Sequence, residues 1–234
     1  MTADDDGGQG TARPPAGLDV PYTHRPRRTA LAGVLLTLLA AVGVVTAFLG
    51  AGPAWVDASV LGESLEARSP ALTTVAVAVT EIGNTASMGV LAGLVGLWLL
   101  RRRRMVDALY VVGTMAGAAL LFTGIKRVLD RPRPPEVDRL VTVANESLPS
   151  GHATMAVAVL GSLVVLAWPR RGTVGRVSMV LGVAGWTGAV GLTRIYLGVH
   201  WFSDVLAGWL VGGAWLALCT AVWSWYRSRT RLPT

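Results

Sequence analysis

The sequence predicts an all-α polytopic membrane protein, a bundle of six transmembrane helices, from three observations. The chain of 234 residues is 52% hydrophobic and has a mean hydropathy of +0.51. Only 15% of its residues are charged, which is too few for a soluble domain of this length. Its apolar residues also fall into long runs that polar and basic segments separate. A chain of this composition is expected to bury its surface in lipid.

The two ends of the chain are polar. Residues 1–28 are rich in Gly and Pro and contain too few apolar side chains to fold, so we expect a disordered cytoplasmic tail. A cleaved signal peptide is not expected, because the first apolar run starts after this tail and is long enough to span a bilayer. Residues 227–234 form a short basic cytoplasmic tail, which leaves 29–226 as the membrane domain.

A helix needs about 20 apolar residues to cross the hydrocarbon core of a bilayer. Residues 29–50 meet this requirement. Residues 51–70 carry several charges and are expected outside the core, as a loop with a short surface helix. Residues 71–82 are apolar but short, and Gly83-Asn84 separates them from 85–100, so we expect a helix packed at the membrane face and then the second span. The remaining spans are expected at residues 105–121, with a continuation to 128, and at 152–168, 174–192 and 201–226.

The basic residues test this count of spans. With the N-terminus inside, fourteen of the 21 Lys and Arg residues fall on the inner side, as the positive-inside rule requires when both termini are cytoplasmic. Snorkelling to lipid headgroups accounts for Arg127 and Arg139 on the outer side. The excess of cations there is better explained by a bound anion. The outer basic residues are Arg68, Lys126, Arg127, Arg131, Arg133, Arg139 and Arg194.

Residues 147–155, SLPSGHATM, put a Ser, a Gly and a His where a loop gives way to an apolar run. Ser150 stands at the position of a helix N-cap, which leaves the amides of Gly151 and His152 free to point out of the helix. A helix N-terminus with a hydroxyl group and no bulky side chain binds anions, phosphate above all. The alternative is that Ser150 only caps the helix and His152 is an interfacial polar residue.

A second motif lies in residues 193–204, TRIYLGVHWFSD. His200 and Asp204 are four residues apart and share a helix face, so the carboxylate can accept an imidazole N–H. That bond fixes the tautomer, leaves the other ring nitrogen as a nucleophile and stabilises the cation formed on attack. Arg194 adds a positive charge, and Gly198 allows a tight turn between. Alone, the His-Asp pair would be an ordinary polar pair at a helix start.

The third motif, residues 126–139, KRVLDRPRPPEVDR, supplies Lys126 and Arg133 as cations on a backbone that prolines hold extended. All three motifs lie at span ends on one membrane face, so the topology brings them to the same depth. The sequence therefore predicts an anion site, a cationic cup with two histidines inside. Two His and one Asp could also bind zinc, but the surrounding cations disfavour a metal ion. We expect no metal and no cofactor.

Together the three motifs resemble the signature of the type 2 phosphatidic acid phosphatase and vanadium haloperoxidase superfamily, and the pattern of spans extends the resemblance to residues 29–226. The resemblance implies a metal-independent phosphatase, a phosphoric ester or diphosphate hydrolase that works through a phosphohistidine. The haloperoxidases of the superfamily are soluble, so a membrane-embedded chain favours the phosphatase branch. By this resemblance His200 attacks phosphorus, Asp204 orients it, and His152 protonates the leaving oxygen and then activates water. The phosphoryl oxygens would be held by Lys126, Arg133, Ser150, Gly151 and Arg194.

The partner implied by this resemblance is a membrane lipid phosphate, whose tail stays in the bilayer while its phosphate reaches water. Phosphatidic acid, phosphatidylglycerol phosphate and undecaprenyl diphosphate fit equally, because the motifs bind the phosphate and not the tail. The expected location is a bacterial plasma membrane, with the active site extracytoplasmic.

Three other functions fit the sequence less well. A transporter would place ionisable residues in mid-span, and a non-catalytic lipid-binding protein would usually lack one of the key His or Asp residues. No nucleic-acid partner is expected despite a net charge of +7, because the basic residues flank apolar runs. The oligomeric state stays open, since small residues on spans serve contacts within and between chains.

Overall fold

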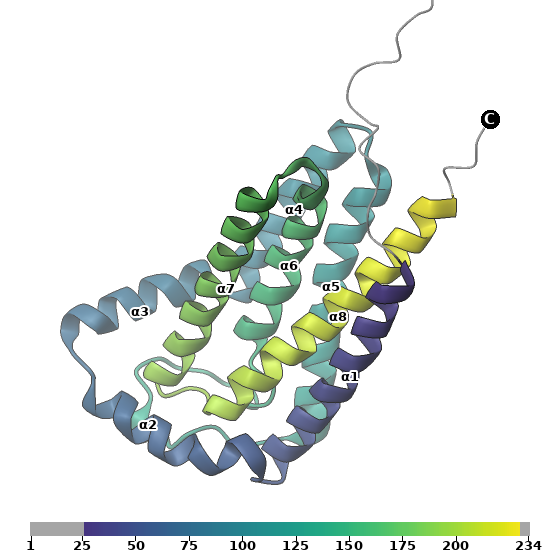
Figure 1. Ribbon diagram of the computed structural model, residues 1–234. Coiled ribbons are helices and arrows are strands. Elements are labelled where there is room, and N and C mark those ends of the chain that lie inside the picture. The colour runs from purple at the N-terminus through teal and green to yellow at the C-terminus, as the bar shows by residue number, and fades with distance from the viewer. Residues whose placement is uncertain (1–25, 230–234) are drawn as a thin grey trace, which may run out of the picture.

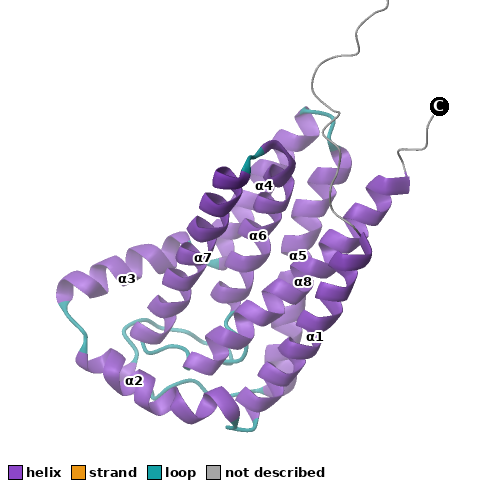
Figure 2. Cartoon of the chain, viewed as in Figure 1, coloured by secondary structure: helices purple, strands orange, loops and turns teal. Residues whose placement is uncertain are grey.

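The computed structural model describes residues 26–229, which form helices joined by loops, with no strand in that range (Figure 1) (Figure 2). The all-α prediction is confirmed for this part of the chain. Residues 1–25, which make up most of the tail expected to be disordered, lie outside the described residues, as do 230–234. The helices are α1 (Pro26–Phe48), η1 (Gly52–Val56), α2 (Asp57–Glu66), α3 (Pro70–Ile82), α4 (Thr85–Arg101), α5 (Met105–Leu129), η2 (Glu136–Asp138), α6 (Gly151–Ala167), η3 (Trp168–Arg170), α7 (Thr173–Tyr196) and α8 (Phe202–Arg229).

Helix α6 lies at the centre of the bundle and contacts α4, α5, α7 and α8. Glycines on α8 set the distance between these two helices. A Cβ atom at Gly208 would lie 2.7 Å from the carbonyl oxygen of Ser150, and one at Gly212 would lie 2.6 Å from that of Thr154. Small residues let membrane helices approach this closely. The first turn of α6 and the first half of α8 are therefore held against each other.

Within residues 26–229, four helices are long and apolar enough to cross a membrane: α1 from Arg28, α5, α6 with its extension to Arg170, and α8. The pair α3 and α4, bent by 42° at a short break, would add a fifth span if it crosses as one. Helix α7 does not reach the same hydropathy, because Gly and Thr residues and two arginines dilute its apolar side chains. The protein is thus an apolar helical bundle with four or five candidate spans, and the predicted count of six is not established.

The segments predicted to hold the site gather at one end of the bundle. Figure 1 shows the loop after α5, the start of α6 and the junction of α7 and α8 at the same end as α2. The start of α1, the end of α8 and the connections α4–α5 and α6–α7 lie at the opposite end. Those connections carry Arg101–Arg104 and Arg170–Arg171, the basic clusters expected on the inner side. The convergence inferred from alternating spans is present.

The predicted helix boundaries agree with the structure to within a few residues, with two differences. The third expected span is the longer of the two alternatives, since α5 continues to Leu129. Residues 51–70 are mostly helical rather than mostly loop, because η1 and α2 follow one another directly.

Arg139, which snorkelling was expected to explain, instead donates two hydrogen bonds to the carbonyl oxygen of Pro134, at 2.7 and 2.8 Å, and so fastens its own loop.

Candidate active site

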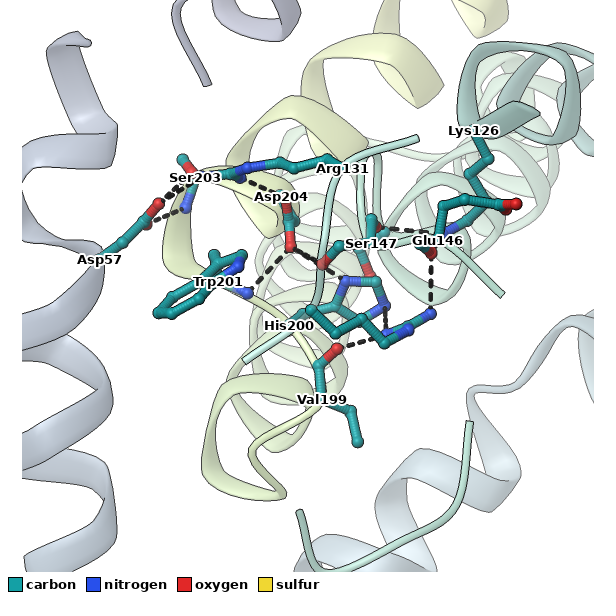
Figure 3. A network of polar contacts seen from close by, with 12 residues as sticks. Asp57, Lys126, Arg131, Glu146, Ser147, Val199, His200, Trp201, Ser203 and Asp204 are labelled. Carbon is teal, nitrogen blue, oxygen red and sulfur yellow. Dashed lines mark hydrogen bonds and ion pairs between the residues drawn. The ribbon is translucent and has the colours of Figure 1, made fainter. Parts of the chain in front are cut away.

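His200 and Asp204 form the pair that their spacing predicts, at the junction of α7 and α8 (Figure 3). Nδ1 of His200 lies 3.3 Å from Oδ2 of Asp204, and both side chains are almost completely buried. Gly198 makes the preceding turn with φ of +70°, and a Cβ there would lie 2.1 Å from the carbonyl oxygen of Asp138. Only glycine fits both requirements. The turn ends with the amides of Val199 and His200 donating to the carbonyl oxygen of Arg194, at 3.1 and 3.2 Å.

Asp204 is held from several sides besides His200. Its Oδ2 accepts hydrogen bonds from the Ser147 hydroxyl and from the amide of Trp201, the latter at 2.9 Å. Its Oδ1 accepts one from Arg131 Nη1 at 2.5 Å (Figure 3). A buried carboxylate needs such compensation to remain ionised. The arrangement fixes an acceptor against the histidine ring.

The other ring nitrogen of His200 faces a cation. Nη1 of Arg133 lies 3.2 Å from Nε2 of His200 and also donates to the carbonyl oxygen of Val199. Because a guanidinium only donates, Nε2 carries the lone pair and Nδ1 carries the proton that bonds Asp204. This is the tautomer that a nucleophilic Nε2 requires. Burial, followed by the charges of Arg133, Arg194, Lys126 and His152, lowers the pKa of His200 well below its usual value, so the ring is neutral at pH 7.

Arg133 and Lys126 both donate hydrogen bonds to the loop before α6. Arg133 donates to the carbonyl oxygens of Asn145, at 2.6 Å, and Glu146, at 3.0 Å. Lys126, in the last turn of α5 and 3% exposed, donates to the carbonyl oxygens of Glu146 and Ser147, the latter at 3.0 Å. Burial lowers the pKa of Arg133 to about 10, and Arg139 nearby acts in the same direction. Arg133 is still charged at pH 7.

Two buried polar atoms beside this network have no hydrogen-bond partner within residues 26–229: Oγ of Ser150 and Nε of Arg194. Ser150 is the N-cap of α6, yet its hydroxyl makes no capping bond, while its amide donates to the carbonyl oxygen of Asp204 at 3.0 Å. Arg194, 5% exposed in the last turn of α7, uses Nη1 to bind Thr80 of α3 at 2.8 Å. Unpartnered buried polar atoms are uncommon in folded proteins, and both of these groups can donate a hydrogen bond to an anion.

Gly151 and His152 begin α6 directly after Ser150. A Cβ at position 151 would lie 3.0 Å from the ring of Phe122, so glycine lets this helix start sit close to α5. His152 is partly exposed. It interacts electrostatically with Arg194, Arg133 and Lys126, and also with His200. All eight residues predicted for the site therefore lie at one end of the bundle, on α5, the loop after it, α6, α7 and α8.

Some polar residues around the site were not singled out by the sequence patterns. Arg131 appeared there only as one of the outer cations, and Asp57 only as a charge that keeps its segment out of the bilayer core. In the structure Arg131 joins both carboxylates, with Nη2 2.9 Å from Asp57 Oδ2 (Figure 3). Ser147 and Ser203 bind the same aspartates. Within residues 26–229 no group of three or more His, Cys, Asp or Glu side chains is placed to hold a metal ion.

The fold and the site define an apolar helical membrane protein with a cluster of cations around a buried histidine. The chain belongs to the PAP2 superfamily, whose family model matches residues 107–229. That range contains all eight residues predicted from the sequence and leaves out Asp57.

Three known proteins illustrate the relationship. A lipid A 1-phosphatase of Rhizobium johnstonii is 34% identical over 147 residues, which cover 56% of this chain and 56% of that protein. Phosphatidylglycerophosphatase B of Bacillus subtilis is 29% identical over 147 residues, 62% of this chain and 72% of that protein. The chain thus spans little more than half the length of the first relative. In fold, the crystal structure of a PAP2 type phosphatidylglycerolphosphate phosphatase from Bacillus subtilis matches with a TM-score of 0.73 at 22% identity, covering 87% of this chain and 99% of that one.

Proposed function

We propose that this protein is a metal-independent lipid phosphate phosphatase that hydrolyses a phosphomonoester or diphosphate of a membrane lipid through a phosphohistidine on His200. The observation that carries the proposal is the combination of an oriented, neutral imidazole with two unpartnered buried polar atoms, Ser150 Oγ and Arg194 Nε. The backbones of both residues adjoin the pair: the Ser150 amide donates to the carbonyl oxygen of Asp204, and the carbonyl oxygen of Arg194 accepts from the His200 amide. A phosphoryl group would satisfy both of them.

The chemistry follows from the hydrogen bonds of His200. Its Nε2 lone pair forms the N–P bond while the P–O bond to the lipid breaks, and His152 gives a proton to the departing oxygen. Asp204 stabilises the cation that the phosphorylated ring becomes. In the second step His152 takes a proton from water, the water oxygen bonds to phosphorus, and the N–P bond breaks to release phosphate. His200 must be neutral to attack while His152 must be protonated to donate, so the rate should show a bell-shaped dependence on pH.

The cations supply the electrostatic part of the catalysis. Charge on the equatorial oxygens of a transferring phosphoryl group is stabilised by fixed positive charges and by amides at a helix N-terminus. We assign this role to Lys126, Arg133 and Arg194, with the Ser150 hydroxyl and the Gly151 amide. Arg133 Nη1 now occupies the space in front of Nε2, so it must turn toward the phosphoryl oxygens when substrate binds.

The proposal includes a topology of six spans, α1, α4, α5, α6, α7 and α8, with α3 at the membrane face. Both termini would be cytoplasmic and the site extracytoplasmic, in a bacterial plasma membrane, with residues 29–226 as one domain between the tails 1–28 and 227–234. The separation of Arg101–Arg104 and Arg170–Arg171 from the site end supports this orientation. Labelling of single cysteines placed in the α4–α5 connection and in the loop 130–150, from outside intact cells, tests it. Modification of the first and protection of the second would reverse the topology.

The substrate class rests on the relatives, whose names describe a lipid A 1-phosphatase and a phosphatidylglycerophosphatase. The test is phosphate release by the full chain in detergent, with EDTA present, from phosphatidic acid, phosphatidylglycerol phosphate and undecaprenyl diphosphate side by side. We expect release from at least one substrate, unchanged by EDTA. Loss of activity with EDTA would overturn the metal-independent mechanism. No release from any of them, with the lipids still bound, would favour a non-catalytic lipid-binding or transport protein instead.

A further inference from the structure

Arg131 links two carboxylates that come from distant parts of the chain. Its Nη1 lies 2.5 Å from Asp204 Oδ1 and its Nη2 lies 2.9 Å from Asp57 Oδ2 (Figure 3). Asp57 is the first residue of α2 and is only 5% exposed, although α2 lies on the outside of the bundle. A surface helix has therefore placed one buried acid next to the residue that orients His200.

Asp57 also fixes the start of α8. The Ser203 amide donates to Asp57 Oδ1 at 2.8 Å, and the Ser203 hydroxyl donates to Oδ2 at 2.6 Å. Ser203 directly precedes Asp204, so the position of Asp57 determines where the Asp204 carboxylate sits. Hydrogen bonds to a buried charged group set geometry strongly, because the surrounding medium screens them little.

The charges of Asp57, Arg131 and Asp204 also favour a role for Asp57 in catalysis. Arg131 offsets part of the negative charge that Asp204 presents to a cation forming on His200. Asp57 adds one negative charge, so the three groups together carry a net charge of −1. This matters because every other charged group that faces His200 is a cation or becomes one when protonated: Lys126 of α5, Arg133 of the loop, His152 of α6 and Arg194 of α7.

We propose that Asp57 and Arg131 are positioning residues that orient Asp204 and keep a net negative charge behind His200 for the cation formed on its ring. The inference rests on the proposed function. It makes α2, which lies outside the residues matched by the family model, part of the catalytic apparatus. Neither residue touches the phosphoryl group; both act through Asp204.

The kinetic test compares substitutions on α2 in the full chain. Asp57→Asn keeps the shape and an acceptor for the Ser203 amide but removes the charge. We expect it to lower kcat by about tenfold or more, with KM changed less than about twofold, because misplacement and lost charge affect the transition state more than binding. Asp57→Glu should recover part of kcat. Glu63→Gln removes an exposed charge from the same helix and should leave both constants unchanged.

A spectroscopic test does not depend on turnover. The chain has three histidines, so ¹⁵N-histidine labelling, with His200→Gln to assign the signal, reports the tautomer of His200 directly. We expect a protonated Nδ1 in the wild type and a mixed tautomer in Asp57→Asn. An unchanged His200 signal together with wild-type kcat would overturn the inference. So would equal kcat losses in Asp57→Asn and Asp57→Glu that parallel their losses of Tm. Failure of the wild type to release phosphate would reject the proposed function and leave the spectrum to test this inference.

Discussion

Asp107 and Asp204 are buried aspartates at opposite ends of the bundle, in the first turns of α5 and α8, and each binds arginine. At Asp107, Arg104 lies 2.6 Å from Oδ2, while Arg227 and Trp223 bind Oδ1 at 2.6 and 3.0 Å. This cluster joins the start of α5 to the end of α8. Its carboxylate is matched by two guanidinium groups.

The surroundings of Asp204 differ from this in two ways. One of its partners is an imidazole, His200, and its single arginine is shared with Asp57. Nearby, Ser150 Oγ and Arg194 Nε have no partner among the described residues. Ser224 Oγ, close to the Asp107 end, is also buried without a partner in residues 26–229, so the unpartnered atoms alone do not separate the two ends. The imidazole on Asp204 and the cations around it do. The comparison assigns structural work to one end and chemistry to the other, and variants at the two ends can test that assignment.

The largest effect is expected from His200→Ala. Removing the nucleophile of an enzyme that works through a covalent intermediate lowers kcat by a factor on the order of 10⁶ in the best-studied hydrolases. We therefore expect no measurable phosphate release from the purified variant in detergent, at a Tm close to that of the wild type. Full activity would show that another residue attacks phosphorus.

Asp204→Asn should leave a trace of activity. The carboxamide can still contact the His200 ring but carries no negative charge, and the corresponding change in another hydrolase costs about 10⁴ in kcat. Single-turnover phosphate release with excess enzyme is sensitive enough to measure this residual activity. A loss as complete as that of His200→Ala would mean that Asp204 does more than orient and stabilise. A loss below about tenfold would mean that it does less.

Ser150→Ala tests the unpartnered atom directly. The hydroxyl makes no bond to the protein within the described residues, so its removal should not lower Tm. A hydrogen bond to a charged group is worth about 1.5–3 kcal/mol, so kcat/KM should fall by about 10- to 100-fold. Ser224→Ala is the matched control, because Ser224 Oγ is also buried without a partner but lies near the far end of α8. Equal effects of the two variants would remove the distinction between the ends.

Local patterns predicted much of the site, for physical reasons. His200 and Asp204 meet because four residues make one helical turn, and Gly198 is required by its own backbone angle. The three motifs converge because alternating spans return the chain to the same face of the membrane. These inferences need only spacing and hydropathy, and the family resemblance supplied roles for the residues.

What the patterns missed depends on contacts between remote segments. Asp57 is 146 residues from Ser203, and nothing in the sequence around it distinguishes it from Glu63 on the same helix. Arg131 and Arg133 are two residues apart, and only the structure shows that one holds Asp204 while the other faces Nε2 of His200. Helix α7 shows the limit of hydropathy, since it is long enough to cross a membrane but not apolar enough to be recognised as a span.

The pH dependence should reflect the burial of His200. Its pKa lies well below 6.5 in the folded protein, so the nucleophile stays neutral as pH falls below 6.5 and is lost only when pH passes through the lowered value. The acid limb of the rate should therefore lie below pH 6.5. The unfolded chain takes up a proton near pH 6.5 and the folded one does not, so the free energy of unfolding should also decrease as pH falls below 6.5. Both are measurable in detergent, by initial rates and by thermal unfolding. An acid limb at or above 6.5 would contradict the assignment.

The smallest effect on turnover is expected from Asp107→Asn. Loss of this carboxylate charge leaves Arg104 and Arg227 facing each other without compensation, which should lower the free energy of unfolding by about 2 kcal/mol and reduce Tm by several degrees. Because the cluster lies at the end of the bundle away from His200, kcat measured well below Tm should stay within about twofold of the wild type. Glu136→Gln, which breaks an exposed pair with Arg139 at 3.5 Å, is the control and should change Tm little. A tenfold loss of kcat in Asp107→Asn would show that the two ends of the bundle are coupled, and the division between a structural end and a chemical end would then be wrong.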